Sequence, residues 1–173
     1  MAWAKDHEHW TVQHWMRVIW TDEAAFYIGG FSGNVWVTRD SQEEFNEHCL
    51  VPQFQRLAHV MVWGAIVADR MGPLVVWDSS WGKITSKAYV EHITKPVIRP
   101  FYDKELYHSW PYCTYVMQDG APAHRAKNTQ LEEKKLGIIR LEWPASSPDL
   151  NPIETLWHTM KSPFRFDQRQ FHK

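Results

Sequence analysis

A proline-containing stretch ahead of an amphipathic helix constrains the fold of this chain more than any other feature. Residues 143–157 have the pattern of a strand end, a polar loop and the first turn of a helix. Pro152 suits the first helical position, where its missing N–H is not needed, and Asn151 before it is a good N-cap. Apolar residues then follow at the spacing of one buried helical face: Ile153, Leu156, Trp157 and Met160.

The acid at the start of this helix is Glu154. It lies at the edge of the apolar face, so its position is set by the packing of the helix. A glutamate here can reach back to the Asn151 backbone as a capping-box partner, or it can serve a site. The helix alone leaves both roles open.

Length and composition predict a single domain with an aromatic core. A chain of 173 residues with 11 tryptophans can bury roughly 70% of its unfolded surface. Cys49 and Cys113 lie in no zinc-ligand spacing, so we expect neither a structural zinc site nor a disulfide framework, and a reducing intracellular compartment. The longest apolar run, residues 60–68, is too short for a bilayer, so no membrane partner is expected.

The charge balance argues against strong nonspecific DNA binding by this chain alone. Nineteen basic and 20 acidic residues leave a net charge of −1, and no block of lysines or arginines is present. The chain therefore lacks the basic footprint that alone supplies strong nonspecific DNA binding. If it acts on DNA, another element is expected to bring it there.

The first half of the chain has the pattern of an antiparallel meander. After a lead-in segment, residues 1–16, strands are predicted at residues 17–28, 35–38, 59–68 and 74–77. Residues 39–57 have no periodicity and are interpreted as a surface excursion, with Cys49 incidental.

The second half alternates helices and strands. We predict a helix over residues 85–106, which Pro96 and Pro100 should bend or end. The remaining predicted elements are a strand at 113–118, a helix at 126–137, a strand at 138–143, the helix after Asn151, and a tail at 162–173.

Two adjacent acids interrupt the first long strand. Asp22 shares a strand face with Val18 and Trp20, whereas Glu23 points to the opposite face, so only one of them can serve a given site. Burying an unpaired carboxylate is unfavourable. Asp22 is therefore either a ligand or a member of an ordinary salt bridge or strand edge.

A third acid follows a later strand. Asp119 stands at the carboxyl end of the strand at 113–118, where α/β sheets commonly build ligand sites, although Asp119-Gly120 is also a common tight turn. His124, a few residues later, is compatible with a helix-entry or core position.

Four segments, in this order, resemble the catalytic domain of mariner-type DDE transposases. They are residues 18–23 (VIWTDE), 60–64 (VMVWG), 117–124 (MQDGAPAH) and 143–154 (WPASSPDLNPIE). Asp119 and Glu154 are separated by 34 residues, as in one branch of that family. The resemblance covers residues 17–161 and implies an α/β, RNase H-like fold: a mixed central sheet, with an antiparallel meander and parallel strands, flanked by helices.

By this resemblance, Asp22, Asp119 and Glu154 would form the DDE triad. They would be both the catalytic residues and the ligands of Mg²⁺ or Mn²⁺, with two ions, in metal-dependent DNA cleavage and strand transfer. His124 and Asn151 match motif positions and would support the active loop.

The resemblance also implies partners and a location. The partners would be transposon ends and target DNA, with a homodimer possible, and the location would be the nucleus. Specific DNA recognition would need an upstream helix-turn-helix domain that these residues do not include. Two alternatives remain open: a non-catalytic, transposase-derived scaffold that binds DNA or protein, and a ribonuclease-H-type nuclease.

Overall fold

The computed structural model describes residues 2–28, 58–109, 112–145 and 147–161. The first half contains α1 (Ala2–Asp6), α2 (Val12–Trp15), β1 (Val18–Ile28), β2 (Ala58–Val67), β3 (Arg70–Val76) and the short 3₁₀ helix η2 (Ser79–Trp81). The second half contains α3 (Ser86–Tyr89), η3 (Val90–Ile98), α4 (Arg99–Ser109), β4 (Tyr115–Met117), α5 (Pro122–Arg125), α6 (Lys127–Lys135), η4 (Pro148–Leu150) and α7 (Ile153–Lys161). The strand predicted at 35–38, the excursion at 39–57 with Cys49, and the tail at 162–173 lie outside the described residues.

The described strands form one mixed sheet in the order β3-β2-β1-β4. β1 pairs antiparallel with β2, β2 pairs antiparallel with β3, and β1 pairs parallel with β4. This is the predicted combination of an antiparallel meander with a parallel strand. Because β4 runs parallel to β1, the carboxyl-terminal end of β4 lies beside the middle of β1, where the two adjacent acids are.

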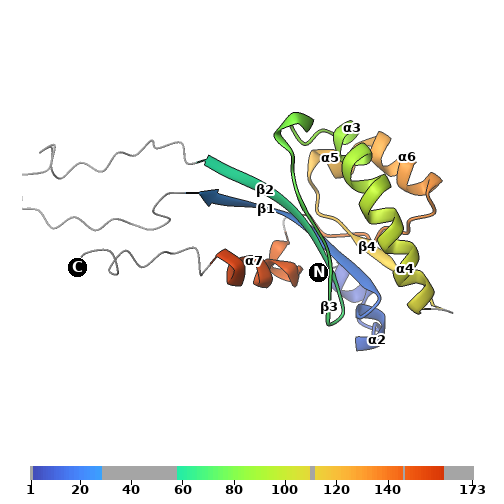
Figure 1. Cartoon of the computed structure of the whole chain (residues 1–173). Coiled ribbons are helices and arrows are strands. Elements are labelled where there is room, and N and C mark those ends of the chain that lie inside the picture. Colours follow the sequence, from blue (N-terminus) through green and yellow to red (C-terminus); the bar gives the residue numbers. More distant parts are fainter. Residues whose placement is uncertain (1, 29–57, 110–111, 146, 162–173) are drawn as a thin grey trace, which may run out of the picture.

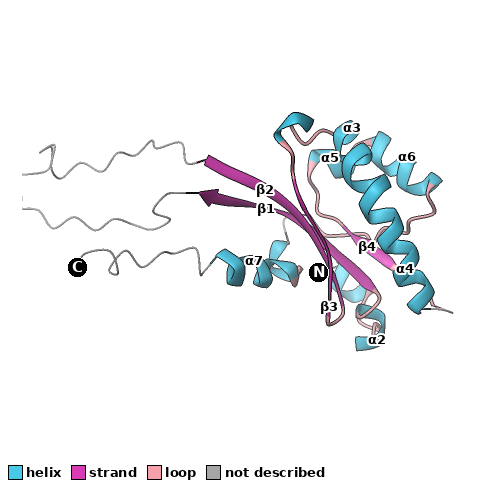
Figure 2. Ribbon diagram, in the orientation of Figure 1, coloured by secondary structure: helices cyan, strands magenta, loops and turns pink. Residues whose placement is uncertain are grey.

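Helices cover both faces of the sheet, as Figures 1 and 2 show: α3 to α6 lie on one side and α7 on the other. The alternation of β1 side chains separates two apolar cores. One core joins the sheet to the long helix and includes Ile19, Trp63, Ala65, Tyr89, Ile93, Ile98 and Tyr102. The other joins the sheet to α7 and includes Val18, Trp20, Ala24, Val62, Ile66, Met117, Ile153 and Trp157.

The helix predicted at 85–106 does not end at its prolines: α3, η3 and α4 follow one another without a break from Ser86 to Ser109. Its N-cap is Thr85, whose hydroxyl accepts a hydrogen bond from the Ala88 N–H at 3.2 Å. η3 is a π-helical segment that contains Pro96, and the Arg99 N–H donates to the Thr94 carbonyl five residues back. The wider turn changes the hydrogen-bond pairing around a residue that has no N–H, and the helix continues.

The strand predicted at 138–143 is reduced to a single parallel bridge between Val116 and Arg140. The Val116 N–H donates to the Ile139 carbonyl, and the Leu141 N–H donates to the Val116 carbonyl. The segment therefore lies beside β4, but its pairing is too short to form a strand.

The lead-in helices α1 and α2 pack against the sheet on the α7 side. Trp10 and Trp15 contact the α7-side core, and the Trp3 indole N–H donates to the Glu142 carbonyl at 2.6 Å. Within the described residues, we find no helix with the length and apolar character needed to span a membrane.

Candidate functional site

The site lies where β4 ends beside β1. Trp20 pairs with Met117 in the parallel register, so Asp22 in the middle of β1 and Asp119 just beyond β4, each two residues further along its chain, lie close together where β4 ends. The sequence prediction that Asp119 follows a strand end is confirmed. The parallel pairing of β1 and β4 is what places it beside Asp22.

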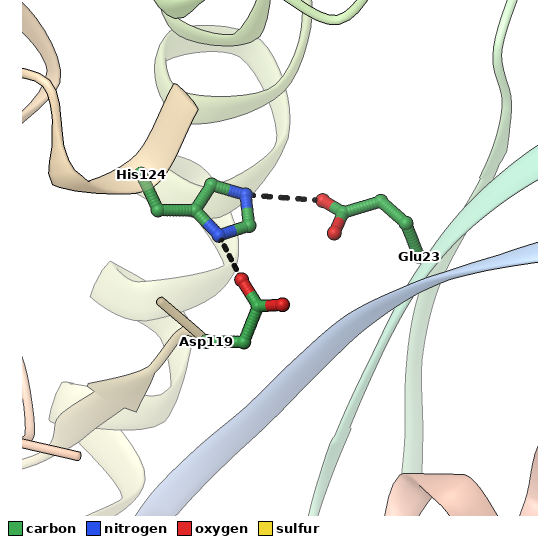
Figure 3. Close-up of side chains that lie close together, drawn as sticks. All are labelled: Glu23, Asp119 and His124. Atoms are coloured by element: carbon green, nitrogen blue, oxygen red, sulfur yellow. Dashed lines mark hydrogen bonds and ion pairs between the residues drawn. The ribbon is translucent and has the colours of Figure 1, made fainter. Parts of the chain in front are cut away.

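His124 lies between two carboxylates, as Figure 3 shows. Its Nδ1 is 2.7 Å from Asp119 Oδ1, and its Nε2 is 3.2 Å from Glu23 Oε1. The ring is 2% exposed, the Glu23 side chain is 14% exposed, and the Asp119 side chain is 47% exposed. The Ala121 N–H also donates to Asp119 Oδ1, at 2.9 Å.

These contacts shift the pKa of His124 and that of Asp119. Burial disfavours a charged imidazole, but the hydrogen bond to Asp119 and the carboxylate of Glu23 at Nε2 outweigh burial and raise the pKa of His124 to about 9. The hydrogen bond from His124, followed by the one from Ala121, lowers the pKa of Asp119 below its ordinary value. His124 therefore places a positive charge beside both Asp119 and Glu23.

Asp22 points to the other face of the sheet, toward α7. The Trp157 indole N–H donates to its Oδ2 at 3.0 Å. Burial raises the pKa of Asp22 to about 7, and the negative charges of Glu23, Glu154 and Asp119 raise it further, against a backbone hydrogen bond that lowers it. Asp22 is thus a partly buried acid on which three other acids act.

Glu154 is brought toward this edge by the start of α7. The Asn151 side chain is buried; its Oδ1 accepts from the Ile153 N–H at 3.4 Å, and its Nδ2 donates to the Thr21 carbonyl on β1 at 3.2 Å. The helix begins at Ile153, as predicted to within one residue. The Asn151 N–H donates to the Pro148 carbonyl rather than to Glu154, so the capping-box role for Glu154 is not observed.

Asp119 and Glu154 lie near enough to Asp22 for their charges to raise its pKa, but the tightest group of possible ligand atoms differs from the predicted triad. In the part of the chain that is described, one set of possible metal-ligand atoms lies within 4.8 Å of one another, and it comes from Glu23, Asp119 and His124. Asp22 and Glu154 are outside that set, although both Glu154 and Asp119 act on the pKa of Asp22.

Sequence reasoning missed Glu23 because it considered strand faces alone. Glu23 does point away from Asp22, as predicted, but α5 carries His124 onto the face that Glu23 occupies. The sequence did contain one signal: the interval between Asp119 and His124 is short enough for a single helical turn to bring the two side chains together.

Comparison with known proteins identifies the family. A family model described as DDE superfamily endonuclease matches residues 17–173. The transposable element Tc1 transposase of Caenorhabditis elegans is 32% identical over 162 residues, which are 93% of this chain and 56% of that protein. The Tcb1 transposase of Caenorhabditis briggsae is 33% identical over 167 residues, with the same two coverages. The chain spans about half the length of these curated relatives.

Solved structures support the fold. The catalytic domain of Mos1 mariner transposase superposes with a TM-score of 0.61 at 16% identity, covering 96% of this chain and 69% of that one. A mariner Mos1 paired end complex with Mg superposes with a TM-score of 0.67 at 16% identity, covering 96% of this chain and 48% of that one. These matches confirm the predicted RNase H-like architecture. Together with the family match over residues 17–173, they show that the chain belongs to the DDE superfamily endonucleases.

Proposed function

We propose that this chain is the catalytic domain of a Tc1/mariner-type transposase, which cleaves DNA and transfers strands with divalent metal. Asp22, Asp119 and Glu154 would be the catalytic residues and metal ligands. The observation that carries the proposal is the environment of Asp22: a partly buried carboxyl group held by Trp157, whose pKa is raised to about 7, with three further acids acting on it.

The donor set fits a hard divalent cation. Three carboxylates supply oxygen ligands of the kind that Mg²⁺ and Mn²⁺ prefer, and acids that repel one another favour a bound cation. Glu23 and Asp119 have His124 as a neighbour, whereas the side chains that act most on the pKa of Asp22, those of Glu23, Glu154 and Asp119, are all acidic. The need for a cation is therefore greatest at Asp22. Two Mg²⁺ or Mn²⁺ ions would activate a water or a DNA 3′-hydroxyl and stabilise the leaving oxygen.

The residues of this chain would hold the ligands in place. Trp157 holds Asp22 Oδ2 through its indole N–H at 3.0 Å, and a backbone hydrogen bond from Glu23 also acts on this carboxylate. Asn151 attaches the start of α7 to β1 and thereby sets the position of Glu154 relative to Asp22. These contacts orient the carboxylates before substrate binds, as in-line displacement at phosphorus requires.

The partners follow from the same proposal. The substrates would be transposon ends and target DNA, and the protein would act in the nucleus as a possible homodimer. The neighbours that support DNA as partner include a Mos1 transposase paired-end complex with left transposon end. Since the net charge is −1, specific recognition would depend on a domain upstream of these residues.

Metal binding tests the proposal without knowledge of the DNA sequence. Mn²⁺ would be titrated calorimetrically into the wild-type chain and into Asp22→Asn, Asp119→Asn and Glu154→Gln, with Asp103→Asn on α4 as a matched surface control. We expect the wild type and the control to bind Mn²⁺ and the three site variants to lose binding.

Anomalous diffraction from Mn²⁺-soaked crystals would locate the ions. Equal Mn²⁺ binding by all variants would refute the triad and favour a non-catalytic scaffold. Cleavage of a matched RNA–DNA hybrid in preference to a DNA duplex would favour a ribonuclease-H-type activity instead.

A further inference from the structure

The histidine between the two carboxylates has a role that the triad does not include. We infer that Glu23 and His124 are positioning residues that hold Asp119 in one orientation, so that Asp119 offers a metal ion its Oδ2 atom and binds it through that atom alone. This inference rests on the proposed function, since it assigns the coordination mode of one of its ligands.

Asp119 Oδ1 is already occupied by hydrogen bonds within the protein. This oxygen accepts two hydrogen bonds, from His124 Nδ1 at 2.7 Å and from the Ala121 N–H at 2.9 Å. Two donors satisfy its lone pairs. Asp119 Oδ2 accepts no hydrogen bond from the described residues, and the Asp119 side chain is 47% exposed. Oδ2 is therefore the oxygen open to a ligand.

His124 is itself held from several sides. Its ring packs against the Tyr89 ring, with centroids 4.5 Å apart, and the Trp63 indole N–H holds the Tyr89 hydroxyl at 3.2 Å. Its carbonyl accepts from Arg140 Nη1 at 2.9 Å. The ring is thus fixed by packing and its backbone by a hydrogen bond.

Glu23 faces the second ring nitrogen of His124, with Oε1 3.2 Å from Nε2. Both atoms are buried and neither has a hydrogen-bond partner among the described residues, so the contact between them is an ion-pair contact. Glu23 pairs with Trp63 across the antiparallel ladder, so β1 and β2 set its position. A carboxylate at Nε2 keeps the opposite nitrogen directed at Asp119, an arrangement by which outer residues commonly orient metal ligands.

The distances argue against an ion between these three residues themselves. Adjacent ligand atoms around an octahedral Mg²⁺ lie about 3 Å apart, because each is about 2.1 Å from the metal. The 2.7 Å between His124 Nδ1 and Asp119 Oδ1 is a hydrogen-bond distance. Mg²⁺ also prefers oxygen ligands to imidazole.

Two substitutions at His124 separate its two nitrogens. An asparagine amide lies close to the position of Nδ1, so His124→Asn keeps a hydrogen-bond donor for Asp119. A glutamine amide lies close to the position of Nε2, so His124→Gln keeps the contact with Glu23 and loses the one with Asp119. Glu23→Gln removes the charge behind the ring. Glu105→Gln is the matched control, because Glu105 is 2% exposed and paired with Arg70, outside the site.

The experiment measures Mn²⁺ affinity in all four variants, with thermal unfolding to verify folding and Mn²⁺-soaked crystals to record how Asp119 binds. We expect His124→Gln and Glu23→Gln to lose about tenfold in Mn²⁺ affinity. His124→Asn should stay closer to the wild type, and Glu105→Gln should equal it. Asp119 should bind through Oδ2 alone in the wild type and through both oxygens in His124→Gln.

Four results would overturn the inference. Unchanged affinity in Glu23→Gln and His124→Gln, while Asp119→Asn still loses binding, would refute it and leave the proposed function intact. Equal losses in His124→Asn and His124→Gln, or an anomalous peak among Glu23, Asp119 and His124, would also refute it. Absence of Mn²⁺ binding by the wild type would overturn both proposals. If His124→Gln does not fold, Glu23→Gln decides.

Discussion

Gly64 lies opposite Asp22 across β1 and β2, and we predict that Gly64→Ala weakens both the fold and the metal site. A Cβ atom at this position would lie 2.6 Å from Cη2 and 3.0 Å from Cζ2 of Trp157. Carbon atoms in contact are normally 3.5–4.0 Å apart, so the indole would have to move by about 1 Å. Trp157 is 3% exposed, which leaves its ring little room.

The magnitude follows from two contributions. Overpacking of this kind typically destabilises by about 1–3 kcal/mol. The displaced indole would also weaken its 3.0 Å hydrogen bond to Asp22, which contributes about 1 kcal/mol more. For a chain of this size, a loss of about 2 kcal/mol lowers Tm by roughly 4–8 °C.

The assay is thermal and urea unfolding with EDTA present, followed by Mn²⁺ titration of the folded variant. Gly120→Ala is the matched control for stability, because its added Cβ would meet only Arg125 Cδ, at 4.0 Å. We expect Gly64→Ala to unfold at a lower temperature and to bind Mn²⁺ more weakly. Changes in stability below about 0.5 kcal/mol are typical of unconstrained surface positions. A change of that size in Gly64→Ala, with unchanged Mn²⁺ affinity, would show that Trp157 does not hold Asp22 in position.

Three further predictions concern pH, the helix start and a buried ion pair. Because the pKa of Asp22 is raised from 3.8 to about 7, its favourable contribution to folding is complete below pH 3.8 and is lost as pH rises through about 7. Asp22→Asn should remove that part of the slope in Tm against pH in EDTA, whereas a slope identical to the wild type would contradict the assignment. Asn151→Ala should lose about 1–3 kcal/mol, measured by urea unfolding, because it removes the cap of α7 and the hydrogen bond to Thr21. Arg140→Met should lose about 3–5 kcal/mol, since it leaves Glu133 buried without its 2.6 Å partner, and an additional Glu133→Gln change should recover part of that loss.

Local chemistry made several elements predictable. Asn151 and Pro152 predicted the start of α7, and the helical spacing of Ile153 and Trp157 predicted the face that it buries. The position of Asp119 after a strand was predictable because apolar residues precede it and Gly120 follows it. Each of these predictions depends on interactions within a few residues, which the sequence displays directly.

Other elements could not be predicted from local patterns. The helix over residues 86–109 continues past Pro96 because a π-helical segment accommodates it, and burial of Ile93 and Ile98 against the sheet stabilises the whole helix. The segment at 138–143 has the composition of a strand, yet its pairing with β4 is limited to the bridge at Val116. Tertiary packing decides such cases, because the partner that completes each element is distant in the chain.

By itself, the sequence determined the family, the order of elements and the three acids that define the candidate site, because these depend on residue type and spacing. Tertiary structure alone decided how the carboxylates are divided between the two faces of β1. The parallel pairing of β1 and β4 brings Asp119 beside Asp22, and α5 carries His124 to Glu23 on the opposite face. The pKa of a carboxyl group depends on which other charges lie close to it, and here those charges come from segments about a hundred residues apart in the chain. The lowered pKa of Asp119 and the raised pKa of Asp22 are therefore properties of the folded structure and not of the local sequence.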